Sequence, residues 1–195
     1  MEIRTDLLKF IVNEREPEKY LEIGIQRGIN FEEIKAPYKV GVEPYPRQKQ
    51  PGVLEMTSDE FFTLQNPDYI GFDLVFIDGL HTEEQTWKDL QNSLERLSEN
   101  GVIVMHDALP HNLEYTSMDW CGTSYKAIMR AAQTPGLKVM TWKKDHGCAV
   151  IVKDSNPMLE ANAVTTKFED LWRNNGAIVN KSNTEEIINF IKSLP

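Results

Sequence analysis

The chain has 195 residues, of which 41% are hydrophobic and 26% are charged, so it has the composition of a folded globular domain and is long enough to bury a core. Its 30 acidic and 21 basic side chains give a formal net charge of −9, which disfavours nucleic acid and anionic membrane surfaces as partners. Two cysteines, no basic and apolar leader and no apolar run of about 20 residues predict a cytoplasmic protein with reduced thiols and no membrane span.

The first half of the chain alternates apolar runs with helical segments. Apolar residues recur at helical spacing over positions 7–12, which predicts a helix that ends before Pro17. Four short runs then read as buried strands, because parallel strands covered on both faces are almost continuously apolar. These predicted strands cover residues 20–23, 39–42, 72–77 and 102–105.

Two capping boxes mark helices between the strands. The box at 82–85 begins a helix whose apolar stripe runs to Leu97 and should stop at Asn100-Gly101. The box at 57–60 begins a helix after a short strand at 53–55. Strands that alternate with helices predict an α/β fold with a doubly wound, mainly parallel sheet. The loops that follow the strands then lie along one edge, where ligands bind in such sheets.

The pattern changes after Gly122. Residues 125–132 read as a helix, and 137–142 and 149–152 read as two strands. The connection between these strands is too short for a crossover helix, so we expect them to pair in antiparallel fashion.

The C-terminal segment reads as a loop followed by helices. Residues 154–166 are predicted to be a loop, and 168–172 and 185–194 to be closing helices. The last helix carries an apolar stripe, which needs a partner surface in this domain or in a second subunit.

Glycines and acidic residues follow the first two strands. Gly24 and Gly28 come directly after Glu22, and glycine lets a backbone turn sharply and approach a ligand closely. Glu43 ends the next strand about 20 residues on, where a carboxylate can accept both ribose hydroxyls. Together these residues favour nucleoside binding. An ordinary strand-to-helix turn and a solvated carboxylate are the structural alternatives.

Ser58 and Asp59 follow the third predicted strand. A side-chain oxygen at this place can meet an adenine amino group. Both residues are also common at helix starts, so a capping role is an equally good explanation.

Two aspartates and two histidines follow adjacent predicted strands. Asp78 and His81 come after one strand, and His106 and Asp107 come after the next. Because these strands end at the same edge, the four groups should converge and could move a proton or bind a metal. Helix capping by His81 and burial of His106 in the core are the alternatives.

These motifs together resemble the class I S-adenosylmethionine (SAM)-dependent methyltransferases. The likeness covers about residues 18–152 and is nearest to small methyltransferases of polysaccharide and cell-wall context and to macrolide-sugar O-methyltransferases. Its motifs are Tyr20 to Gly24, Gly41 to Glu43, Ser58 to Phe62, Phe72 to His81, Trp120 to Thr123 and His146 to Cys148. The run from Phe76 to His81 is the most specific of them.

The resemblance implies a seven-stranded Rossmann-like sheet with an antiparallel strand at its C-terminal end, in a single domain of residues 1–195. The core would cover about 18–152 and a helical extension about 153–195. The expected reaction is O-methylation of a hydroxyl on a sugar or other small molecule, with SAM bound by residues at the strand ends. These cofactor-binding residues are Glu22, Gly24, Gly28, Glu43, Ser58, Asp59 and Asp78.

The resemblance also implies catalytic roles. Asp78 and an acidic pair at 106–107 would bind a divalent cation, Mn²⁺ or Mg²⁺, and His81 would be the general base. Position 106 departs from that pattern, because His106 supplies nitrogen and suits manganese, iron or zinc better than magnesium. Alternatively the metal is lost and His106 is an acid/base group. The start of the following helix, together with a metal, would keep His81 neutral.

Other functions remain as alternatives. An NAD-dependent oxidoreductase of Rossmann type would have the same doubly wound sheet. The Gly-x-Gly-x-x-Gly motif of such enzymes is incomplete here, because position 26 is Gln26. A cofactor-binding module without transfer activity would keep the fold alone. The loop 108–121, with His111, Tyr115 and Trp120, is expected to cover a small-molecule acceptor, and aromatic faces suit a sugar or glycan. A homo-oligomer is left open.

Overall fold

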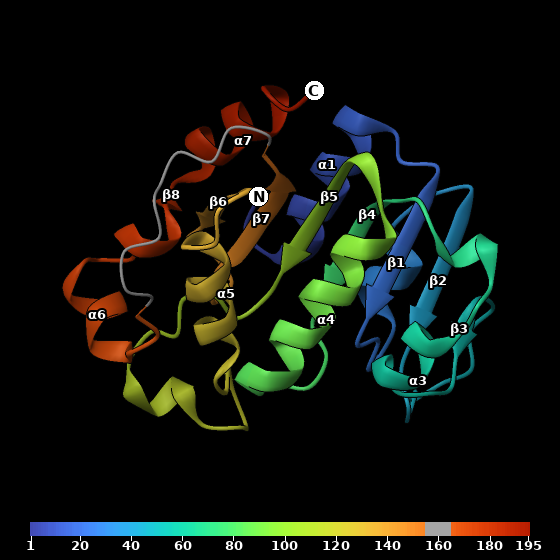
Figure 1. Cartoon of the computed structure of the whole chain (residues 1–195), viewed down its shortest axis with the longest axis horizontal. Helices are drawn as coiled ribbons and strands as arrows, with labels where there is room; N and C mark the ends of the chain where they lie inside the picture. The colour runs from blue at the N-terminus through green and yellow to red at the C-terminus, as the bar shows by residue number, and fades with distance from the viewer. Residues whose placement is uncertain (155–164) are drawn as a thin grey trace.

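A single mixed sheet with helices on both faces forms the protein (Figure 1). The computed structural model describes residues 1–154 and 165–195. The strands are β1 (Lys19–Ile23), β2 (Tyr38–Val42), β3 (Val53–Leu54), β4 (Phe72–Ile77), β5 (Leu97–Met105), β6 (Leu137–Trp142), β7 (Cys148–Lys153) and β8 (Lys181–Ser182). The α-helices are α1 (Arg4–Arg15), α2 (Ile29–Glu33), α3 (Ser58–Thr63), α4 (Glu83–Arg96), α5 (Ser124–Ala132), α6 (Phe168–Arg173) and α7 (Thr184–Lys192). Short 3₁₀ turns cover Pro67–Tyr69, Leu113–Thr116 and Ala177–Val179.

The strand order is β3-β2-β1-β4-β5-β7-β6-β8. All neighbours are parallel except β7, which is antiparallel to both β5 and β6. The predicted doubly wound, Rossmann-like sheet is therefore confirmed, and the short strand β8 adds an eighth strand to the seven expected. An antiparallel β7 between β5 and β6 differs from the all-parallel order of classical dinucleotide-binding domains, so the topology argues against the NAD-dependent alternative.

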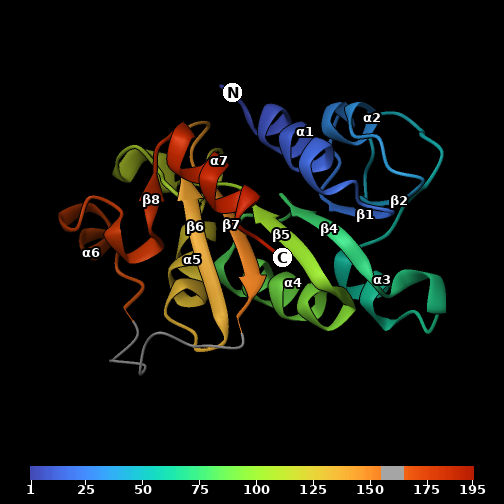
Figure 2. The ribbon, with the colours of Figure 1, turned by 90° about the horizontal axis from the view of Figure 1, so that it is seen from above.

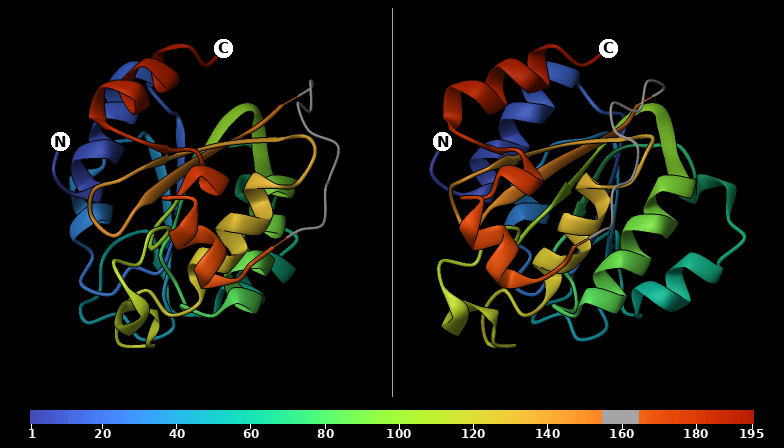
Figure 3. Two further views of the ribbon diagram at one scale, coloured as in Figure 1. Left: turned by 90° about the vertical axis from the view of Figure 1, so that its left-hand side faces the viewer. Right: turned by 60° about the vertical axis from the view of Figure 1, so that its left-hand side comes forward.

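Helices form a layer on each face of the sheet (Figures 2 and 3). Leu74 and Phe76 of β4 belong to the core under α1, α2 and α7, whereas Val75 and Ile77 belong to the core under α3, α4, α5 and α6. Because both faces are covered, the strands are apolar on both sides, and this explains the continuous apolar runs in the sequence.

The stripe on α7 finds its partner within this chain. Ile187 is fully buried, and α7 packs against β6 and α1. The two closing helices are thus confirmed. Most of the predicted loop 154–166 lies outside the described residues, which resume at 165.

The predicted end of the fourth helix is wrong. Helix α4 ends at Arg96, and Leu97 already pairs with Phe72 as the first residue of β5. Leu74, two residues further along β4, pairs with Val102, five residues further along β5. The extra residues of β5 form a bulge that holds Asn100-Gly101. A Cβ at Gly101 would lie 2.5 Å from Leu97 Cγ. The glycine therefore makes room for a bulge and does not stop a helix.

Two other expectations concern the whole chain. Cys121 and Cys148 are both buried, and neither is in a disulfide. Among the described residues, no helix is both long and apolar enough to cross a membrane.

Candidate active site

A cleft of about 940 Å³ opens where β1, β2, β4 and β5 end. Its volume is in the range of small-molecule sites. Most of the residues predicted from sequence line it, namely Gly24, Glu43, Ser58, Asp59, Asp78, His81, His106 and Asp107. Glu22 and Gly28 are not part of the lining that the described residues form.

Gly24 brings the first turn against the end of β4. Its φ is +87°, and a Cβ there would lie 2.1 Å from the carbonyl oxygen of Asp78. No side chain fits at this position, so the backbone forms a bare wall of the cleft. Gly28 also has a positive φ of +77°, but a Cβ there would meet the flexible side chain of Gln50.

Glu43 holds the Gly24 turn in shape. Its Oε2 accepts hydrogen bonds from the amides of Ile25 and Gln26, at 3.1 and 3.0 Å, and its Oε1 accepts one from the amide of Tyr45 at 3.0 Å. A carboxylate has about four acceptor sites. One therefore remains for a ligand hydroxyl, so Glu43 can shape the loop and bind ribose together.

Glu22 lies behind the cleft. Only 1% of its surface is exposed, and the Tyr20 hydroxyl donates a 2.6 Å hydrogen bond to its Oε2. Burial raises the pKa of Glu22 to about 8, so the side chain is neutral at pH 7. Its position is that of a core group beneath the site, and it offers no direct contact to a ligand in the cleft.

Ser58 and Asp59 are tied to α4. The Gln85 amide donates to Ser58 Oγ at 3.1 Å and to Asp59 Oδ1 at 3.0 Å, and Lys88 pairs with Asp59 at 2.8 Å. The side chain of Gln85 therefore binds α3 instead of the backbone of Thr82. The capping box predicted for α4 is only half formed, with the Thr82 hydroxyl accepting a hydrogen bond from the backbone N–H of Gln85. The other box, Thr57 with Glu60, is complete.

Asp78, His81 and Asp107 form a compact group at the centre of the cleft. His81 Nε2 lies 3.5 Å from Asp78 Oδ1 and 3.3 Å from Asp107 Oδ2, and one ligand atom from each residue lies within 4.8 Å of the others. His81 Nδ1 is hydrogen-bonded to the Trp120 carbonyl oxygen. A carbonyl accepts only, so Nδ1 carries the proton, and in the neutral ring the Nε2 lone pair faces both carboxylates. This donor set fits a divalent cation.

The expected neutral state of His81 is not what its surroundings favour. The hydrogen bond to Asp78, aided by the charge of Asp107, raises the pKa of His81 even though burial opposes this. With protons on both nitrogens, the ring would bridge the two carboxylates. A metal ion in the same place would displace the Nε2 proton.

His106 has a different role from the metal ligand predicted. Its Nε2 donates to the carbonyl oxygen of Asp145 at 2.7 Å, and its Nδ1 lies 3.3 Å from both Asp78 Oδ1 and Asp107 Oδ1. All of these partners are acceptors, so both nitrogens carry protons. Burial lowers the pKa of His106, but the charge of Asp78 and the other carboxylates outweigh it, and the pKa lies well above the usual value. The structure thus brings together Asp78, Asp107 and His81, with His106 as a buried cation beneath them.

Sequence patterns missed Arg4 and Asp145. The Arg4 amide donates to Asp145 Oδ2 at 2.7 Å, and Arg4 Nη1 donates to the same oxygen at 3.1 Å. Arg4 Nε also lies 3.5 Å from Asp78 Oδ2. The two residues are 141 positions apart, and neither lies in a local motif, so no signal short of the folded structure could have joined them.

An aromatic cluster forms one wall. Trp120 lines the cleft and is 47% exposed, and its ring lies 4.8 Å from that of Tyr115 and 5.9 Å from that of His146. The loop 108–121 therefore lies beside the catalytic group, where an acceptor would enter.

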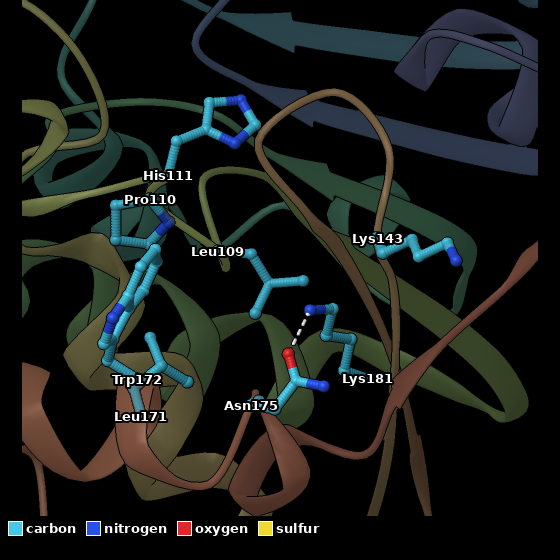
Figure 4. Close-up of a pocket in the computed structure, with 9 residues that line it drawn as sticks. Leu109, Pro110, His111, Lys143, Leu171, Trp172, Asn175 and Lys181 are labelled. Carbon is cyan, nitrogen blue, oxygen red and sulfur yellow. Dashed lines mark hydrogen bonds between the residues drawn. The ribbon is translucent and has the colours of Figure 1, made fainter.

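A second cavity of about 250 Å³ lies behind this wall (Figure 4). Lys181 donates to Asn175 Oδ1 at 2.8 Å at its edge, and Leu109 and Trp172 supply apolar walls. His111 belongs to its lining, and the His111 ring lies 4.8 Å from that of His146 in the cleft. No predicted cofactor or metal residue lines this cavity, so the chemistry is assigned to the larger cleft.

Comparison with known proteins agrees with the topology. Residues 21–108 match the family described as a methyltransferase domain. A Podospora anserina methyltransferase bound to S-adenosylhomocysteine is similar in fold, with 19% identity, a TM-score of 0.61 and 78% of each chain covered. A Bacillus cereus O-methyltransferase in complex with S-adenosylhomocysteine has 15% identity and a TM-score of 0.61, over 77% of this chain and 80% of that one. The SAM-bound O-methyltransferase TomG from Streptomyces achromogenes has 15% identity and a TM-score of 0.58, over 78% and 80%.

No curated protein matches the sequence. The strand order, with its antiparallel β7, and these structural likenesses define the fold as that of the class I methyltransferases. Residues 21–108 match a methyltransferase domain, and the described fold is the one seen in similar solved methyltransferases bound to S-adenosylhomocysteine.

Proposed function

We propose that this protein is a SAM-dependent methyltransferase that transfers the methyl group of SAM to a hydroxyl group of a small-molecule acceptor. The observation that carries the proposal is the position of the Asp78, His81 and Asp107 group, which shares one cleft with the Gly24 turn. A hydroxyl is a weak nucleophile until its proton leaves, and this group can remove it. The similar structures named as O-methyltransferases support the same reaction.

The cofactor would lie along the strand ends. We assign the Gly24 wall and Asp78 to its amino-acid part, Glu43 to its ribose, and Ser58 and Asp59 to its adenine. Glu22 and Gly28 would act through the shape of the turn, because neither lines the cleft among the described residues. When bound, SAM supplies an activated methyl group on sulfur, and the protein has to position the acceptor in line with it.

Asp78, His81 and Asp107 would hold a divalent cation, which lowers the pKa of a hydroxyl bound to it. His81 is a better candidate for this role than for the predicted general base, because the hydrogen bond to Asp78 raises the pKa of the ring, whereas a base at this position has to be unprotonated. His106, the other predicted catalytic histidine, would position the two carboxylates. Mn²⁺ suits a mixed oxygen and nitrogen donor set better than Mg²⁺.

Several finer assignments stay predictions. A sugar or glycan acceptor is supported by the exposed face of Trp120 beside Tyr115. A location in the cytoplasm, a homo-oligomer and a single domain of residues 1–195, with a core of about 18–152 and an extension of about 153–195, also await their own tests.

Calorimetry with S-adenosylhomocysteine tests the cofactor assignment. We expect one site per chain, and Glu43→Ala should weaken binding by about 1–3 kcal/mol, because polar partners are left unpaired. NAD binding without binding of either sulfur compound would contradict the proposal. Transfer is tested separately, with isotope-labelled SAM and a panel of sugars and other hydroxylated compounds. Tight binding without a methylated product on any of them would favour a binding module.

A further inference from the structure

The side chain of Arg4 places a cation in the cleft next to the Gly24 turn. Arg4 begins α1 and lines the cleft together with Gly24 and Asp78. Its Nη1 is held by Asp145 at 3.1 Å, and its Nε lies 3.5 Å from Asp78 Oδ2. Gly24 in turn lies against the backbone of Asp78. The guanidinium is therefore fixed at the end of the cleft where β1 and β4 meet.

Part of this guanidinium has no hydrogen bond. Arg4 Nε is buried and makes none, although Asp78 is close enough for an ion pair. Among the described residues, the side chain donates hydrogen bonds only through Nη1, to Asp145. Nε and Nη2 form one edge of the planar fork, the edge that binds a carboxylate with two parallel hydrogen bonds. Nε is covered and lies beside Asp78, so Nη2 is the nitrogen of this edge that remains for a ligand.

Four backbone donors of the glycine turn are already used. The amides of Ile25 and Gln26 donate to Glu43, and those of Gly24 and Gly28 donate to backbone carbonyls of Val42 and Ile25. An anionic group beside these four amides therefore gains from a side-chain donor.

The charges around the cleft also favour a cationic side chain as the partner of a ligand carboxylate. Its acidic lining residues are Glu43, Asp59, Asp78, Asp107, Asp119 and Asp145. Its arginines are Arg4 and the exposed Arg27 on the far side of the turn. The amino-acid part of SAM carries both an ammonium and a carboxylate. The ammonium has many acidic partners here, whereas an unpaired carboxylate would be repelled.

We propose that Arg4 binds the carboxylate of the amino-acid part of the cofactor through the Nη2 side of its guanidinium. The inference rests on the proposed cofactor site. It extends that site to α1, which lies before the segment matched by the methyltransferase domain family and in which no cofactor residue was predicted. Arg4 would also link the cofactor to the catalytic group, because it contacts Asp78 as well.

Two ligands separate recognition of the carboxylate from all other contacts. S-adenosylhomocysteine carries the amino-acid part, whereas 5′-methylthioadenosine has the same adenosine and a thioether but lacks it. By calorimetry, Arg4→Met should weaken binding of S-adenosylhomocysteine about 10- to 100-fold, the effect of losing charge-assisted hydrogen bonds. Its affinity for 5′-methylthioadenosine should change less than about twofold. Arg4→Lys, which keeps the charge but lacks the fork, should lie between wild type and Arg4→Met.

Arg15→Met is the matched control for the packing of α1. Arg15 lies at the other end of the same helix and donates to the carbonyl oxygens of Asn100, Leu194 and Pro195, so its loss loosens α1 without touching the cleft. We expect both affinities to be unchanged in this variant. Thermal melting of each variant shows whether the fold is retained.

Three results would overturn the inference. Equal losses for both ligands in Arg4→Met would mean that Arg4 only holds α1 in place. A selective loss for S-adenosylhomocysteine in Arg27→Met, and not in Arg4→Met, would place the carboxylate on the other side of the turn. If Arg4→Met does not fold, unchanged affinity of Arg4→Lys for both ligands would also show that Arg4 does not bind the carboxylate. If wild type binds neither ligand, the cofactor proposal fails as well, and this outcome is distinct from the others.

Discussion

Asp78 and Asp107 place two negative charges a few ångströms apart at the ends of neighbouring strands. His106 approaches both carboxylates with one nitrogen from below, and His81 faces both from the cleft. Asp107 has a φ of +60°, which is unusual for a residue other than glycine. Strained backbone of this kind is often kept where a side chain has to be aimed. The arrangement directs both carboxylates at one point.

A divalent cation should bind at that point. We expect MnCl₂ to raise the melting temperature of the wild-type protein, because a ligand that binds only the folded state stabilises it. Asp107→Asn should lose this response. The control is Asp119→Asn, which removes an exposed carboxylate that lines the same cleft but lies outside the group, and its response to manganese should be retained. MgCl₂ should have a smaller effect than MnCl₂.

The methylation rate distinguishes a metal-ligand role of His81 from a general-base role. With a cation site, exhaustive chelation should lower the methylation rate in wild type, and His81→Gln should lower both the rate and the response to manganese. Full activity after chelation, combined with a loss of about 10²–10⁴-fold in His81→Gln, would return His81 to the role of general base and remove the metal from the mechanism.

At the scale of the elements, local patterns identify a strand or helix well when its own residues set its structure. The strands at 72–77 and 137–142 were predicted with the bounds that β4 and β6 have in the structure. The end of α4 was not, because the turn at Asn100-Gly101 belongs to a bulge whose shape depends on packing against Leu97 and on pairing with β4. Glycine signals a special backbone at such a place but not which element needs it.

Two glycines with similar backbones should differ in what an added methyl group does. Gly24 and Gly71 have φ values of +87° and +77°, but a Cβ at Gly24 would meet the backbone of Asp78, whereas one at Gly71 meets nothing within 4 Å. Gly71→Ala should cost about 1–2 kcal/mol, the cost of a left-handed residue. Gly24→Ala should cost about 1–3 kcal/mol more, because the backbone has to move.

Urea denaturation of the two variants measures this difference. Gly24→Ala should also lose affinity for S-adenosylhomocysteine, while Gly71→Ala keeps it. Equal destabilisation with equal affinity would show that the close approach of the Gly24 turn to β4 is not needed for the site.

At the scale of the whole molecule, the cleft is completed by segments far apart in the chain. The turn between β6 and β7 supplies Asp145 and His146, and α1 supplies Arg4. The sequence motifs predicted most residues that line the cleft, because these residues follow four parallel strands that end at one edge of the sheet. The order of strands and helices along the chain is enough to predict that edge. The contacts of Arg4 depend on how α1 packs on the finished sheet, and no pattern along the chain encodes that.

The pH dependence of stability should reveal the buried carboxyl group under the cleft. Glu22 has a pKa of about 8 in the folded protein, raised by burial from the usual value of 4.5. Between these two values the folded state holds a proton that the unfolded state has released. The free energy of unfolding should therefore fall as pH rises through this window, by up to about 1.4 kcal/mol per pH unit from this group. Below pH 4.5 and above pH 8 its contribution should be flat.

Glu22→Gln isolates this effect from that of other titrating groups. The amide cannot ionise but still accepts the hydrogen bond from Tyr20, so the variant should gain stability relative to wild type as pH rises from 5 to 8. His81 and His106, whose pKa values are raised, also lose stabilising protons at higher pH, but they do so in both proteins and cancel in the difference. Tyr20→Phe removes a hydrogen bond that lowers the pKa of Glu22 and should extend the window to higher pH. Urea denaturation at pH 5, 6.5 and 8 gives the three curves, and a constant gap between wild type and Glu22→Gln would show that Glu22 is ionised in the folded protein throughout.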